Sequence, residues 1–263
     1  MNPLLQEVLP LDYNGLLNLG SQLGRQLMTS GAEISRVEDS ILRLMQAYGV
    51  HDAQVFAIPN CLIVCLTPPD GQPITRVSRI PAHGLDLDRL ELYNAACRRL
   101  CRELPPPDQA QQQVAHIAQH HPHYRDWAVI MGHFLAAAFF TFFFGGSSLD
   151  SLCGGLCGVA IALSTRILRH VAGTSAFFHT LMSAALTSLL AQFFVWSGLA
   201  HNADAITIGA LMLLVPGVAL TTAMREVLAG DIVSGITRTT ESVLTATAIA
   251  LGTGAALAFA RLL

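Results

Sequence analysis

Long stretches of apolar residues without charge dominate the second half of the chain, and they constrain the fold more than any other feature. Between Asp126 and Asp150 the sequence runs WAVIMGHFLAAAFFTFFFGGSSL, with no charged residue. About 20 mostly apolar residues are enough for a helix to cross the hydrocarbon core of a bilayer. We therefore predict an α-helical integral membrane bundle of five transmembrane helices, at about 127–145, 150–168, 176–198, 205–224 and 240–260.

Charge is unevenly distributed along the 263 residues, and this separates two regions with different solvents. Twelve of the 18 acidic and nine of the 15 basic residues precede residue 121. We therefore predict a cytoplasmic α+β domain at 1–122 and a transmembrane domain at 123–263. The formal net charge of −3 argues against a nucleic-acid surface, which would need a basic excess to neutralise phosphates.

The loops between the predicted spans differ in basic residues, and this predicts the orientation in the membrane. Arginines occur before span one (Arg125), at the end of span two (Arg166, Arg169) and between spans four and five (Arg225, Arg238), whereas the loops GGSSLD and LAHNAD have none. Short cytoplasmic loops carry the excess of Lys and Arg. We expect a cytoplasmic N-terminus without a cleaved signal peptide, a periplasmic C-terminus, and a location in the bacterial inner membrane.

The first half has the pattern of a small mixed domain. Apolar residues recur at helical intervals over 14–47, with Gly31 marking a joint between two helices. The β-rich segments AQVFAI, CLIVCLT and ITRVSRI follow, and Asp70-Gly71 between the last two is a strong hairpin signal. Helices are expected at about 86–103 and 108–121, separated by three prolines at 105–107.

Two segments resemble the threonine/serine exporter (ThrE) family. They are GAEISRVEDSI at 31–41, with the strand pair and TRVSRI that follow it, and LLVPGVALTTAMREVLAGDIVSGITR at 213–238. Full transporters of this family have about ten spans, either in one chain or divided between two. The five spans expected here resemble the larger, YjjP-type subunit of the split form.

The resemblance implies a function, a partner and a substrate class. It implies a subunit of a secondary transporter that exports threonine and serine or dicarboxylates such as succinate, together with a small hydrophobic, YjjB-like membrane subunit. Homo-oligomerisation, which the split form does not predict, is kept open. No ATP-binding motif is present, so an ion or proton gradient would drive export, and no cofactor is expected.

The fourth span contains one candidate for a transport path, Pro216-Gly217. Proline removes a backbone donor and clashes with the preceding turn, so we predict a kink or break there. Interrupted helices form the substrate sites of many transporters, although a purely structural kink is an open alternative.

The charged stretch 225–241 supplies further candidates. Arg238 could pair with a substrate carboxylate, and Asp231 could relay protons if it is buried. Gly235, between them, and Arg225 are further candidates for the transport path. An ordinary basic loop facing the cytoplasm explains the same residues.

In the first domain, Glu33, Arg36 and Glu38 form a charged cluster that could perform acid–base chemistry. A solvated helix face with local ion pairs explains these residues more simply. A membrane-anchored hydrolase is the main alternative function, but no nucleophile-and-base motif supports it, and we predict no enzyme activity. A membrane scaffold or sensor is the third hypothesis.

Two further groups could bind metal, although we predict no metal site. The six cysteines form three pairs spaced four residues apart, which suits buried apolar positions better than zinc ligation. Histidines cluster just before span one, at His116, His120, His121 and His123.

Overall fold

The computed structural model describes residues 11–80, 84–119, 124–172 and 175–262, and these form two compact units. The first unit contains the described residues up to 119 together with Thr222–Thr237. The second contains the described residues from 124 to 221 and those from Arg238 onward. The segment Thr222–Thr237, which the sequence assigned to the membrane domain, thus packs with the N-terminal residues.

A three-stranded antiparallel sheet in the order β1-β2-β3 forms one layer of the first unit. Its strands are β1 (Ala53–Ile58), β2 (Cys61–Leu66) and β3 (Ile74–Arg79), which confirms the three predicted strands. The β2–β3 hairpin has Gly71 at φ +81°, and the Asp70 carboxylate accepts a hydrogen bond from the amide of Gln72. Glycine tolerates this left-handed conformation, so the Asp-Gly signal correctly located the turn.

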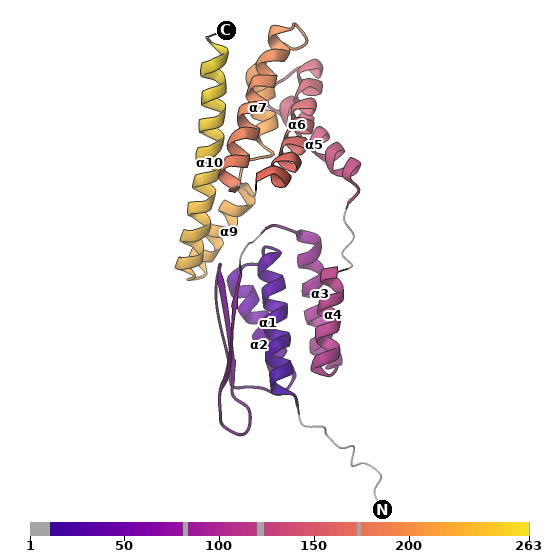
Figure 1. The fold of residues 1–263 in the computed structure, drawn as a ribbon, viewed down its shortest axis with the longest axis vertical. Coiled ribbons are helices and arrows are strands. Elements are labelled where there is room, and N and C mark those ends of the chain that lie inside the picture. Colours follow the sequence, from indigo (N-terminus) through magenta and orange to yellow (C-terminus); the bar gives the residue numbers. More distant parts are fainter. Residues whose placement is uncertain (1–10, 81–83, 120–123, 173–174, 263) are drawn as a thin grey trace, which may run out of the picture. The chain divides into compact units, whose positions relative to one another are not determined.

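Helices α1 (Tyr13–Thr29) and α2 (Ile34–Ala47) lie between this sheet and the pair α3 (Leu87–Glu103) and α4 (Pro107–Gln119), as Figure 1 shows. The α1–α2 joint lies at Gly31, as predicted. The central strand β2 turns alternate residues toward the helices, and these side chains are fully buried: Leu62, Val64 and Leu66. They pack with apolar residues of α1 and α2 into one core, so this part of the chain has its own hydrophobic interior.

The second unit is helical. It contains α5 (Asp126–Phe143), α6 (Ser148–Ala172), α7 (Ala176–Trp196), α8 (Ala203–Leu211), the start of α9 (Gly217–Leu228) and most of α10 (Ile232–Ala260). Within the described residues, four helices are long and apolar enough to cross a membrane: α5, α6 to Leu168, α7 and α10. This confirms a multi-pass helical architecture, with four such helices rather than the five expected.

The difference arises at the expected fourth span, 205–224. The chain forms two short helices there, because α8 ends at Leu211 and α9 begins only at Gly217. Proline cannot donate a backbone hydrogen bond and its ring excludes the preceding helical turn. The predicted break at Pro216-Gly217 is therefore confirmed, and the five-span count does not hold for continuous helices.

Small residues allow α5, α6 and α8 to approach closely around the buried Thr141. A Cβ atom on Gly154 would lie 2.1 Å from Thr141 Oγ1, and one on Gly209 would lie 2.5 Å from the backbone nitrogen of Thr141. A Cβ atom on Gly158 would lie 2.4 Å from the carbonyl oxygen of His133. The Gly154–Gly158 motif thus serves packing within the chain, as small residues do in membrane helix contacts.

The Asp150 carboxylate connects two loops of this unit. Its Oδ2 atom accepts hydrogen bonds from the amide and hydroxyl of Ser147, both at 2.8 Å. Its Oδ1 atom accepts from the amides of His201 at 2.7 Å and Asn202 at 3.1 Å. The side chain is buried, with 2% exposed, so these donors replace the water that a carboxylate otherwise needs.

Candidate functional site

The candidate site begins at the turn between α1 and α2. Gly31 adopts φ +94°, and a Cβ atom there would lie 2.7 Å from the carbonyl oxygen of Gly84. Both the backbone conformation and the close approach therefore require glycine. The turn places Glu33 immediately before α2, where its side chain makes no capping hydrogen bond to the helix.

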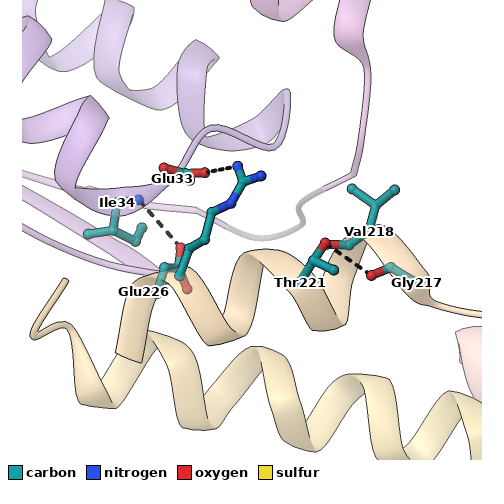
Figure 2. A network of polar contacts seen from close by, with 7 residues as sticks. Glu33, Ile34, Gly217, Val218, Thr221 and Glu226 are labelled. Carbon is teal, nitrogen blue, oxygen red and sulfur yellow. Dashed lines mark hydrogen bonds and ion pairs between the residues drawn. The ribbon is translucent and has the colours of Figure 1, made fainter. Parts of the chain in front are cut away.

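Two side chains from the end of α9 meet this start of α2 (Figure 2). Arg225 Nη1 lies 3.0 Å from Glu33 Oε1, and Glu226 Oε1 accepts a hydrogen bond from the amide of Ile34 at 3.4 Å. The first amides of a helix have no partner within the helix, and the helix dipole favours negative charge beside them. Glu226, with only 1% of its surface exposed, therefore acts as a cap supplied from 192 residues away.

One helical turn further along α2, Glu38 is held by strand β1. Its Oε1 atom accepts a hydrogen bond from the amide of Ala57 at 2.7 Å. Burial raises the pKa of the Glu38 carboxyl above its ordinary value, and the negative charge of Asp231 raises it further, while the Ala57 hydrogen bond acts in the opposite direction. Glu38 and Asp231 therefore interact electrostatically across the α2 and α9–α10 segments.

A tight corner between α9 and α10 positions Asp231. Gly230 adopts φ +96°, and the amide of Asp231 donates to the carbonyl oxygen of Glu226 at 2.9 Å. A Cβ atom on Gly235 would lie 2.3 Å from a methyl carbon of Val227, so a glycine there lets the two helices approach closely. The predicted candidate Gly235 thus serves this corner as a packing residue.

The structure brings together four of the residues that the sequence singled out: Glu33, Glu38, Arg225 and Asp231. Arg36 lies elsewhere, on an exposed face of α2 beside α3. Pro216, Gly217 and Arg238 belong to the second unit.

Sequence reasoning missed the roles of Glu226 and Asp150. Asp150 is an acidic residue far in sequence from any other charge, and that isolation is the signal that could have identified it, whereas Glu226 lies within the charged stretch 225–241 and nothing local marks its role. Charged groups in apolar surroundings require a partner.

The structure offers no support for a metal site in the part of the chain that it describes, where no group of three or more His, Cys, Asp and Glu residues is placed to hold an ion. Of the histidine cluster, His116 lies on α4, whereas His120, His121 and His123 lie outside the described residues. Among the cysteines, Cys97, Cys153 and Cys157 are buried and the other three are half-buried, as expected for small apolar side chains.

Four long apolar helices and an N-terminal three-stranded sheet covered by helices define a multi-pass membrane protein with a mixed α/β domain. Comparison with known families identifies it further. The chain belongs to the family described as "Putative threonine/serine exporter", whose profile matches residues 18–260. This is a family of transporters, not of enzymes, and the match confirms the resemblance seen in the sequence.

Two curated fungal proteins are similar to the chain. It is 24% identical to the "Pheromone-regulated membrane protein 10" of Debaryomyces hansenii over 81% of its own length and 21% of that protein. It is also 24% identical to an uncharacterized protein of Schizosaccharomyces pombe, over 81% of its length and 29% of that protein. The chain therefore spans less than a third of either relative. No solved structure matches it.

Proposed function

We propose that the chain is the larger subunit of a two-component secondary transporter that exports threonine and serine, or a dicarboxylate such as succinate. The observation that carries this proposal is the interruption of an apolar segment at Pro216-Gly217 in a chain that belongs to an exporter family. A half-helix that begins inside an apolar segment presents its N-terminal amides and positive dipole end, which suit an anionic substrate group. A small hydrophobic membrane subunit would complete the path.

Residues other than Pro216 and Gly217 also have roles in this proposal. The hydroxyl of Thr221 donates to the carbonyl oxygens of Gly217 and Val218, which occupies carbonyl groups in the first turn of α9 (Figure 2). Arg238 on α10 supplies a cation for a substrate carboxylate. Asp231, beside the raised-pKa carboxyl of Glu38, belongs to a carboxylate pair suited to carrying a proton.

The distribution of arginines supports a cytoplasmic N-terminus, a periplasmic C-terminus and a bacterial inner membrane for this proposal. The ion pair between Arg166 and Asp126, at 2.8 Å, is consistent with it, because the end of α6 and the start of α5 then face the same side.

Flux measurements in vesicles test the proposal. The chain is reconstituted with its small partner, and the export of radiolabelled threonine and succinate is followed under an imposed proton or sodium gradient. Pro216→Ala should favour a continuous helix and lower flux at least about tenfold, and Arg238→Gln should lower flux similarly. Asp204→Asn, an exposed substitution at the start of α8, is the matched control. Absence of flux from the assembled pair under every gradient would refute the proposal.

A further inference from the structure

A cavity of about 500 Å³ opens where α2 and α3 lie side by side. We call it the α2–α3 pocket. On each helix the lining residues recur at intervals of three or four, so one face of each helix forms a wall. The lining residues are Arg36, Asp39, Ser40 and Arg43 from α2, and Asn94, Cys97, Arg98, Cys101 and Arg102 from α3.

Positive charge is concentrated around this pocket. Four of the 15 arginines of the chain line it, against a single carboxylate, although the whole chain has a net charge of −3. Asp39 is already engaged, because its Oδ2 atom lies 3.0 Å from Arg43 Nη2. Within the described part of the chain, no carboxylate lies within ion-pair distance of Arg36, Arg98 or Arg102. Like charges around a shared hollow repel one another, and a bound anion would relieve that repulsion.

The floor of the pocket is polar but uncharged. The Cys97 thiol is buried and donates to the carbonyl oxygen of Ser40 at 3.6 Å. Burial, together with the neighbouring Cys101, raises the pKa of Cys97 to about 12, so the thiol stays neutral and adds no negative charge. Asn94 provides an additional hydrogen-bond donor, whereas the Ser40 hydroxyl already donates to the carbonyl oxygen of Arg36 at 2.7 Å.

We propose that the α2–α3 pocket binds a phosphate group, carried by a soluble metabolite or by a lipid headgroup. The planar fork of a guanidinium matches phosphate oxygens and forms paired, charge-assisted hydrogen bonds with them. A volume of about 500 Å³ lies within the range of small-molecule sites, roughly 300–1,000 Å³. The pocket shares no lining residue with the proposed export path, because its walls come from α2 and α3 alone.

Binding of inorganic pyrophosphate to the full chain in phosphatidylcholine nanodiscs tests the proposal. Titration calorimetry should show saturable binding. The double variant Arg98→Gln/Arg102→Gln should weaken it at least about tenfold, because several charge-assisted hydrogen bonds are lost. Arg36→Gln should also weaken pyrophosphate binding, and this variant tests the wall that α2 forms, opposite Arg98 and Arg102 of α3. Arg25→Gln, which removes an exposed arginine of α1 outside the pocket, should leave binding unchanged.

A second arm distinguishes the two sources of phosphate. The titration is repeated in nanodiscs in which about a fifth of the lipid is phosphatidylglycerol, at physiological salt. Loss of pyrophosphate binding there identifies a lipid headgroup as the occupant, whereas unchanged binding identifies a soluble phosphate compound. The proposal is overturned if pyrophosphate fails to bind in phosphatidylcholine, or if the pocket variants bind as tightly as Arg25→Gln. The variants are compared only when their melting temperature without ligand matches that of the parent chain.

Discussion

The Nη1 atom of Arg225 lies 3.0 Å from the Oε1 atom of Glu33, although 192 residues separate them in the chain. The two residues belong to the two segments on which the resemblance to the exporter family rests, 31–41 and 213–238. The contact shows that Thr222–Thr237, the part of the second segment that belongs to the first unit, packs with the first segment. Glu33, Glu38, Arg225 and Asp231 therefore lie in the same small region.

Charge reversal tests this pairing. Glu33→Arg and Arg225→Glu should each lower the melting temperature, and the double reversal should restore most of the loss. The effect of each single change should be about 1 kcal/mol or less, because 71% of the Arg225 side chain is exposed and solvent screens the pair. Thermal unfolding of the full chain in detergent provides the measurement. A double variant whose loss equals the sum of the single losses would contradict the pairing.

Glu226 should matter more for stability than Glu33. Glu226→Ala removes the acceptor for the amide of Ile34 and leaves that donor buried, at a cost of about 1–3 kcal/mol. Glu226→Gln keeps an acceptor oxygen and should lose less. Thermal unfolding of both variants is compared with that of Glu91→Ala, an exposed change on α3. Equal melting temperatures for Glu226→Ala and Glu91→Ala would exclude the capping role.

Glu38 should make stability depend on pH. Its pKa is raised in the folded state, so the folded chain retains this proton more strongly than the unfolded chain does. The resulting contribution to stability is fully present below the unfolded pKa of about 4.5 and is lost as pH rises through the raised pKa. Glu38→Gln should remove this component while keeping an acceptor for Ala57. Unfolding curves of the parent chain and of Glu38→Gln, recorded across that pH range, provide the measurement. If the stability of both depends on pH in the same way, Glu38 does not make this contribution.

The glycines around Thr141 should differ in how they respond to a second change. Gly154→Ala would collide with the Thr141 side chain, so adding Thr141→Ala should recover part of the lost stability. Gly209→Ala would collide with the backbone of Thr141 as well as with its Oγ1 atom, so the same second change should leave most of the lost stability unrecovered. Gly254→Ala, where a Cβ atom meets nothing within 4 Å, is the control. The melting temperatures of the single and double variants provide the measurement. If Thr141→Ala rescued both glycine variants equally, the contact of Gly209 with the Thr141 backbone would be wrong.

Much of the fold follows from local patterns in the sequence. The β-rich segments and the Asp70-Gly71 turn located the strands, and the apolar periodicity with Gly31 located α1 and α2. These predictions hold because each depends on a few neighbouring residues. Pro216 also acts locally, through its missing donor and its ring, so the break in the fourth apolar segment was predictable. The predicted number of spans nevertheless remained five, although the break replaces one long helix with two short helices.

The candidate site was only partly predictable, because its contacts join distant parts of the chain. From the sequence, Glu33 and Glu38 were predicted to lie either on a solvated helix face or in a local charged cluster with Arg36. In the structure, Arg225 and Asp231 approach them from the other end of the chain, and Arg36 points instead to the α2–α3 pocket. A single sequence contains no record of which distant charges meet.

Asp150 has a consequence for how the chain assembles. Its four hydrogen bonds come from both sides, two from Ser147 beside α6 and two from His201 and Asn202, which follow α7. When only α5 and α6 have entered the membrane, the carboxylate lacks half of its donors, and it acquires them once the later helices arrive. The segment after α7 therefore supplies the hydrogen bonds that Asp150 cannot obtain from α5 and α6 alone. Insertion of α5 and α6 thus depends on the later helices α7 and α8 during biogenesis.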